Sequence, residues 1–115
     1  MNSSYCMVIT TAPDREAAEK LAENILNNKL AACIQMADIR SFFLWEGVLR
    51  KEEEVALYIK TTEARYNDLE SYIEEYHPYD VPEIIKLPVT AGLPGYLDWL
   101  DSTTGTFSSG SFPCC

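Results

Sequence analysis

The chain has 115 residues, of which 47% are hydrophobic and 11% aromatic. This length and composition are typical of one domain with its own core, and they argue against global disorder. Nine Lys and Arg against eighteen Asp and Glu give a net charge of −9. Because phosphates and anionic lipids attract basic surfaces, we predict that the chain binds neither nucleic acid nor membranes.

The first half of the chain predicts a strand, a helix and a long hairpin. The apolar run 5–11 predicts the strand, and Asp14 is a suitable N-cap for the amphipathic helix that follows. Residues 30–45 and 48–62 are then two long strands, joined at the turn signal Glu46-Gly47.

The second half predicts a helix, a strand and a short final helix. Residues 63–77 have a helical apolar stripe that Pro78 ends. Residues 84–89 form the fourth strand, and Pro88 within it indicates an edge or bulged position. Tyr96 to Leu100 suit a short helix, and the residues after it are rich in Ser, Thr and Gly.

We therefore divide the chain into a domain at 1–104 and a tail at 105–115 that ends in Cys114-Cys115. The role of the two tail cysteines stays open. The other two cysteines, Cys6 and Cys33, lie in apolar runs and are expected to be buried thiols. No secretory signal or membrane-length apolar run is present, which predicts a cytoplasmic protein.

The element order β-α-β-β-α-β plus a terminal helix predicts an α+β, ferredoxin-like sandwich. Both crossover helices should cover one face of an antiparallel sheet. The long strands nevertheless carry apolar residues on both faces, which a soluble monomer seldom exposes. We expect contact with other copies of the chain through Phe42, Phe43, Trp45, Tyr58 and Trp99.

Six segments occur in the order of a known family and span most of the chain. The chain thereby resembles the CutA family, which is named for divalent-cation tolerance. The resemblance implies a homotrimer and an association with copper(II) and other divalent metals. The segments are Thr11-Ala12-Pro13-Asp14, Lys29-Leu30-Ala31-Ala32-Cys33, Trp45-Glu46-Gly47, Ile59-Lys60-Thr61-Thr62, His77-Pro78-Tyr79-Asp80-Val81-Pro82-Glu83-Ile84 and Tyr96-Leu97-Asp98-Trp99-Leu100.

His77 is the only histidine and therefore the candidate copper ligand. The alternative is a structural role, because a His in the last helical turn before Pro78 suits a helix C-terminus. Some relatives have a Cys and a second His where this chain has Thr10 and Tyr76. Since copper prefers thiolate and imidazole to hydroxyl groups, this departure predicts weak binding or none.

A second candidate site combines Lys, Glu and aromatic side chains near strand ends. In a trimer, Trp45, Glu46, Lys60, Tyr79 and Glu83 are expected to meet in a cleft between subunits. Such a cleft suits a small anionic ligand, as in a signalling or scaffold trimer similar to the PII class. A purely structural set of interface contacts is the alternative. No nucleophile elbow or phosphate loop is present, so we predict that the protein is not an enzyme.

Overall fold

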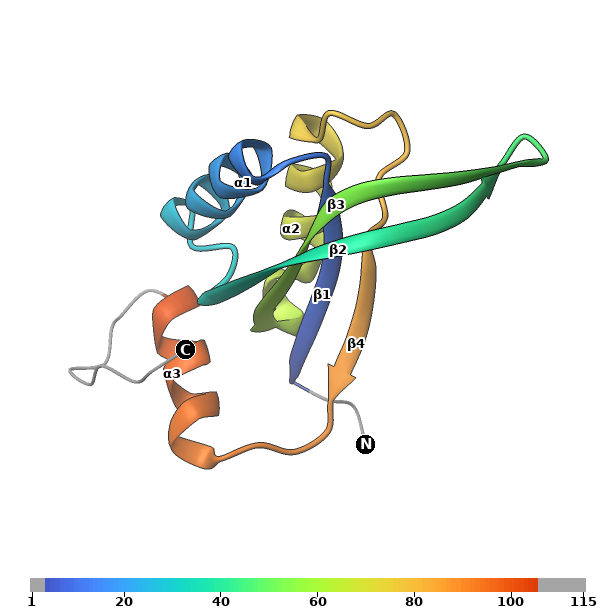
Figure 1. Ribbon diagram of the computed structural model, residues 1–115. Helices are drawn as coiled ribbons and strands as arrows, with labels where there is room; N and C mark the ends of the chain where they lie inside the picture. The colour runs from blue at the N-terminus through green and yellow to red at the C-terminus, as the bar shows by residue number, and fades with distance from the viewer. Residues whose placement is uncertain (1–3, 106–115) are drawn as a thin grey trace.

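The computed structural model describes residues 4–105, which form four strands and three helices (Figure 1). The elements are β1 (Tyr5–Ala12), α1 (Arg15–Asn27), β2 (Cys33–Trp45), β3 (Val48–Thr62), α2 (Glu63–Tyr76), β4 (Ile85–Val89) and α3 (Pro94–Thr104). The strands lie in the order β2-β3-β1-β4, and every neighbouring pair is antiparallel. The predicted ferredoxin-like α+β fold is confirmed.

The core lies between one face of the sheet and the helices α1 and α2, which Figure 1 shows together on that side. Alternate side chains of each strand point toward the helices, because successive residues of a strand face opposite ways. Val8 on β1 and Ile59 on β3 are opposite each other in the register, and both are fully buried. Ile25 of α1 and Ile73 of α2 close the core from the helix side.

The local signals for the first helix and for the hairpin turn are confirmed. Asp14 is the N-cap of α1, and its Oδ1 accepts a hydrogen bond from the Ala17 N–H at 2.8 Å. Glu46 and Gly47 both have positive φ angles, of 50° and 77°. Two such residues form the turn that best matches the twist of a tight hairpin.

Three predicted features differ in position or chemistry. β2 begins at Cys33 rather than at residue 30, because Lys29 turns the chain with a φ of 56° before it enters the sheet. α3 runs on to Thr104, whose carbonyl accepts a hydrogen bond from Arg65 Nε at 2.8 Å. Cys6 is the buried free thiol that was expected, whereas Cys33 is buried but disulfide-bonded.

The hairpin extends well beyond the rest of the sheet, as Figure 1 shows. β1 pairs only with Val55–Thr62 of β3, so residues 39–54 form a two-stranded ribbon, here called the arm. The radius of gyration is 15.0 Å, against about 13 Å expected for a compact chain of this length. Neither of the covering helices reaches along the arm.

Candidate functional site

His77 caps the C-terminus of α2 and is 8% exposed. Its Nε2 lies 2.5 Å from the Thr11 carbonyl oxygen, and its Nδ1 lies 3.0 Å from the Tyr79 backbone nitrogen. A carbonyl only accepts, so Nε2 must carry the proton and Nδ1 must accept from the Tyr79 N–H. Both ring nitrogens therefore have partners within the chain, and the ring joins the ends of α2 and β1 to the following loop.

Thr10 and Tyr76, the two departures from the ligand set that the resemblance implies, do not share an environment. Thr10 is fully buried in the sheet, and its Oγ1 has no hydrogen-bond partner. Tyr76 is 60% exposed and packs its ring against Tyr72, with the ring centres 4.6 Å apart. Within residues 4–105 no group of three or more His, Cys, Asp or Glu is placed to hold a metal ion.

The five residues predicted for an inter-subunit cleft are spread over the molecule. Trp45 and Glu46 lie at the tip of the arm, whereas Lys60 lies at the other end of β3 and donates to Gln35 Oε1. Lys60 lies twelve positions along β3 from Val48, which corresponds to about 40 Å of extended strand. These residues do not meet within one chain, and their contact across a subunit boundary stays a prediction.

The residues predicted for contact with other copies are accessible in the single chain. Phe42 and Trp45 on the arm are 60% and 54% exposed, and Phe43 is 39% exposed. Tyr58 on the sheet face away from α1 and α2 is half-buried, as is Trp99 on α3. The arm also exposes the large apolar residues Leu44, Val48 and Leu49. This surface is available for burial by other copies.

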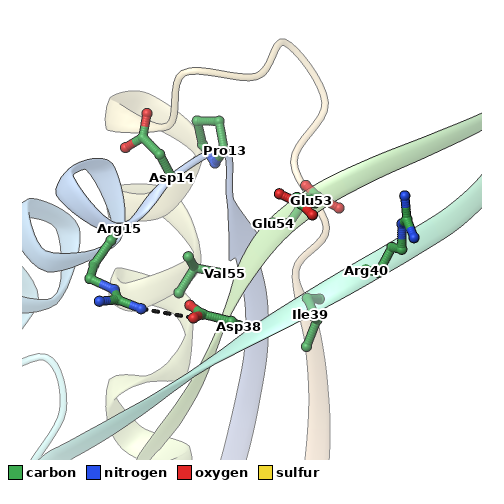
Figure 2. Close-up of a pocket in the computed structure, with 9 residues that line it drawn as sticks. All are labelled: Pro13, Asp14, Arg15, Asp38, Ile39, Arg40, Glu53, Glu54 and Val55. Atoms are coloured by element: carbon green, nitrogen blue, oxygen red, sulfur yellow. Dashed lines mark hydrogen bonds and ion pairs between the residues drawn. The ribbon is translucent and has the colours of Figure 1, made fainter.

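Sequence reasoning missed a cleft where β1 leaves the sheet and β3 continues into the arm (Figure 2). The cleft has a volume of about 630 Å³. It is lined by Pro13, Asp14, Arg15, Asp38, Ile39, Arg40, Glu53, Glu54 and Val55. One signal was present in the sequence, because Asp38 and Arg40 interrupt the otherwise apolar run of β2.

Two polar contacts involve residues that line this cleft. Arg15 Nη2 lies 2.7 Å from Asp38 Oδ2, and both side chains are largely exposed, so the ion pair adds little stability. Glu54 also accepts a hydrogen bond at its Oε2 from the Tyr79 hydroxyl, at 2.7 Å. Burial and this hydrogen bond both raise the pKa of Tyr79 above its usual value, so the phenol stays protonated as a donor.

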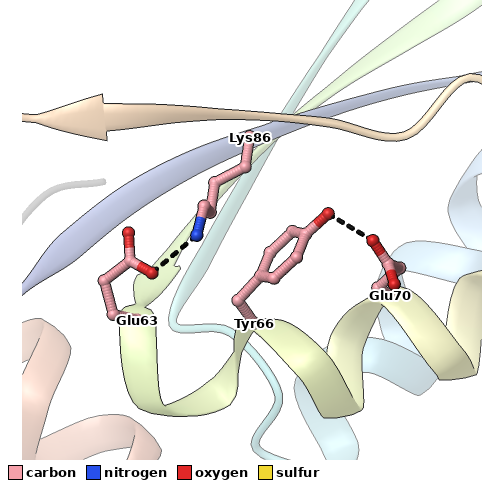
Figure 3. A network of polar contacts seen from close by, with 4 residues as sticks. All are labelled: Glu63, Tyr66, Glu70 and Lys86. Carbon is pink, nitrogen blue, oxygen red and sulfur yellow. Dashed lines mark hydrogen bonds and ion pairs between the residues drawn. The ribbon is translucent and has the colours of Figure 1, made fainter.

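A separate polar network joins the edge strand β4 to α2 (Figure 3). Lys86 Nζ lies 2.8 Å from Glu63 Oε2 and 4.6 Å from the centre of the Tyr66 ring. The Tyr66 hydroxyl donates to Glu70 at 2.6 Å, and this bond is the main cause that raises the pKa of Tyr66 to about 12. The network holds β4 in place, and Pro88 lies in this edge strand as predicted.

These features define a class of protein: a ferredoxin-like domain with a protruding apolar hairpin. The chain belongs to the CutA1 divalent ion tolerance protein family, whose model matches residues 6–103. The resemblance found in the sequence is thereby confirmed.

Individual relatives agree with this assignment. The divalent-cation tolerance protein CutA of Pyrococcus horikoshii is 41% identical over 98 residues, which cover 85% of this chain and 96% of that protein. The chloroplastic protein CutA of Arabidopsis thaliana is 42% identical over 85% of this chain. The match covers 54% of the Arabidopsis protein, so this chain spans about half of that relative's length.

Solved structures match over most of their length as well. The periplasmic divalent cation tolerance protein CutA from Archaeoglobus fulgidus aligns with a TM-score of 0.86 and 36% sequence identity. The alignment covers 88% of this chain and 99% of that one. In the part of this chain that the structure describes, no helix is long and apolar enough to cross a membrane.

Proposed function

We propose that this chain takes part in divalent-cation tolerance as a non-catalytic homotrimer, and that Cu(II) binds it weakly, at His77. The observation that carries the proposal is the family match over residues 6–103, together with relatives that are named divalent-cation tolerance proteins. The support for this role is therefore the chain's membership of the family, and not a metal site found within the single chain. The cytoplasm stays our predicted compartment, although two of these relatives are named as periplasmic and chloroplastic.

The homotrimer is supported by the apolar surface of the arm. Leu44 and Val48 are 74% and 57% exposed on a ribbon that neither α1 nor α2 covers. A large apolar patch of this kind typically marks an interface in a soluble protein. Packing of the arm against other copies would remove it from water.

Weak binding of Cu(II) follows from the hydrogen bonds of His77. Copper needs a ring nitrogen with a free lone pair, and the lone pair of Nδ1 accepts the Tyr79 N–H. A metal at this nitrogen must displace that hydrogen bond, at a cost of about 1 kcal/mol. The residues near His77 therefore do not fit a strong copper site in one chain, and Thr10 and Tyr76 supply neither thiolate nor imidazole.

Calorimetric titration with Cu(II) tests this proposal on the full chain with Cys33→Ser, Cys114→Ser and Cys115→Ser, so that neither the disulfide-bonded Cys33 nor the two tail cysteines can supply a thiol. We expect weak saturable binding that His77→Gln abolishes, because Gln has no imidazole to bind the metal. The amide of Gln can still form hydrogen bonds near Thr11 and Tyr79, so this variant should keep its fold. The control variant Tyr76→Phe should bind as the parent does. Binding that persists in His77→Gln, or binding of nanomolar strength, would contradict the assignment.

The alternative function, a PII-like trimer that holds a small anion, uses Trp45, Glu46, Lys60, Tyr79 and Glu83 from different subunits. It remains a prediction about the assembled trimer. Lys60→Ala distinguishes it, because this change should remove an anion site and leave Cu(II) binding at His77 unchanged.

A further inference from the structure

We propose that the C-terminal tail is a redox-sensitive strap, which closes onto the start of β2 through a disulfide between Cys33 and one of the two tail cysteines. The proposal goes beyond the proposed function, because it uses neither His77 nor a metal ion. It rests on the bonding state of the described cysteines, on the place where α3 ends and on the neighbour of Cys33 in the sheet.

The cysteine content of the chain limits the possible partners of Cys33. The chain has four cysteines, Cys6, Cys33, Cys114 and Cys115. Cys33 is disulfide-bonded, whereas Cys6 is a free thiol that is buried in the core. Cys114 and Cys115 lie outside the described residues 4–105, and within one chain they are the two cysteines left to bond Cys33. The second tail cysteine then keeps its thiol.

The end of α3 and the start of β2 lie at the same end of β3. Cys33 is opposite Lys60 in the register, and the Ala32 N–H donates to the Lys60 carbonyl at 3.1 Å. β3 leads directly into α2, where Arg65 Nε donates to the Thr104 carbonyl at 2.8 Å. This bond holds the end of α3 beside the start of β2 (Figure 1). The tail therefore begins close to Cys33.

The way in which the chain leaves α3 is also defined. A Cβ atom at Gly105 would lie 2.9 Å from the Asp101 carbonyl oxygen, so a larger residue would displace the backbone there. Cys114 follows Gly105 by nine residues, which span up to about 30 Å when extended. A segment of this length can return to Cys33 without any movement of α3.

Burial determines how the disulfide opens. Cys33 is 2% exposed, so an incoming thiolate must attack the sulfur of the tail cysteine. That attack forms a mixed disulfide on the tail and releases Cys33 as a thiolate. The second thiol of a dithiol reductant then displaces the tail thiolate, and both thiolates take up protons from water. The dithiol is oxidised to its disulfide. A small-molecule disulfide such as oxidised glutathione is reduced to two thiols in the reverse exchange.

Lys60 acts as a positioning residue for this exchange. Opposite residues of an antiparallel pair have Cβ atoms about 5 Å apart on one face of the sheet, so the Lys60 side chain lies next to Cys33. Its ammonium group donates to Gln35 Oε1, two residues along β2 on the same face. A cation beside the leaving sulfur stabilises the thiolate that forms and so speeds its release.

The predicted compartment gives the strap a regulatory role. Disulfides in the cytosol are usually transient and redox-sensing, because its thiol pool keeps structural cysteines reduced. The strap therefore closes when that pool is oxidised and opens when it recovers.

Tryptic mapping of the full chain tests the bond, after equilibration with oxidised glutathione and alkylation in urea. Cleavage at Lys and Arg places Cys33 in peptide 30–40, Cys6 in peptide 1–15 and both tail cysteines in peptide 87–115. We expect peptides 30–40 and 87–115 to be joined in a protein that runs as one chain on a non-reducing gel. The link should persist in Cys6→Ala and disappear in the double variant Cys114→Ser, Cys115→Ser.

Alkylation of Cys33 without a reductant would overturn the proposal, and so would a link found only between two chains. Urea unfolding at a fixed protein concentration gives a second readout. Reduction with dithiothreitol should lower the midpoint of the parent by about 1–2 M, because the bond closes a long loop, and it should leave the double variant unchanged. Equal midpoints of the oxidised and reduced parent would overturn the strap as a constraint on the fold.

The rate at which dithiothreitol separates the two peptides tests the role of Lys60. Lys60→Gln should slow this reduction about threefold, because the leaving thiolate loses its neighbouring cation. The matched control is Lys51→Gln, an equal charge change on the arm, which should be reduced at the rate of the parent. An unchanged rate in Lys60→Gln, or equal slowing in both variants, would overturn the role of Lys60.

Discussion

The contact between Tyr79 and Glu54 gives the sharpest test of the structure, because one atom can be removed from it. Tyr79→Phe deletes the hydroxyl that donates to Glu54 Oε2 at 2.7 Å. The ring contact with His77 and the bond from the Tyr79 N–H to Nδ1 should remain. A hydrogen bond to a charged group contributes about 1.5–3 kcal/mol to stability. Because Glu54 keeps partial access to water, we expect a loss of about 1–1.5 kcal/mol.

Urea unfolding at a fixed protein concentration measures this loss as a lower midpoint with an unchanged slope. The matched control is Tyr76→Phe, the same chemical change at a residue that is 60% exposed, and it should cost less than about 0.5 kcal/mol. In a Glu54→Ala background, Tyr79→Phe should lose most of its effect, because the two side chains share one contact. An equal cost in both backgrounds, or a cost no larger than that of the control, would refute the contact.

Two further predictions concern the arm and the buried thiol. Trp45→Asp or Phe43→Asp should give insoluble or monomeric protein by light scattering, because each places a charge on the surface that other copies bury. Lys51→Asp on the same arm is the control and should not have this effect. A soluble trimer with normal melting in either of the first two variants would contradict the interface. Burial chiefly raises the pKa of Cys6 from 9.0 to about 11. The folded chain therefore keeps this proton where the unfolded chain loses it, and stability is fully present below pH 9 and falls as pH rises toward 11. The fall is roughly 3 kcal/mol by the linkage relation, and Cys6→Ala should not show it in its urea midpoints. Equal alkaline slopes in the two proteins would refute the prediction.

Local signals in the sequence were sufficient for the element order and for the hairpin turn. Asp14 and Glu46-Gly47 act within a few residues of the chain, so their chemistry is visible without the fold. Pro88 could also be placed at an edge, since it lacks the N–H that a central strand requires. The start of β2 was missed, because a positive φ at Lys29 is not encoded by a glycine.

The polar contacts of the site could not be predicted from the sequence, for a different reason. Arg15 and Asp38 are 23 residues apart, and Tyr79 and Glu54 are 25 residues apart. No helical or strand period relates such positions, and only the folded topology brings them together. The two hydrogen bonds of His77 are of the same kind, since Thr11 is 66 residues away. A lone histidine in the sequence therefore leaves the choice between ligand and structural residue open.

The arm and the cleft have a single topological origin. β1 has 8 residues and β3 has 15, so nearly half of β3 extends past its inner neighbour. That excess leaves the apolar arm without a covering helix, and it also leaves the β3 edge open beside Pro13. Because Glu53 and Glu54 lie at this junction, copies that pack on the arm would border the cleft. Shortening the hairpin to the length of β1 would remove both features together, whereas point substitutions at the arm tip should change assembly and leave the cleft in place.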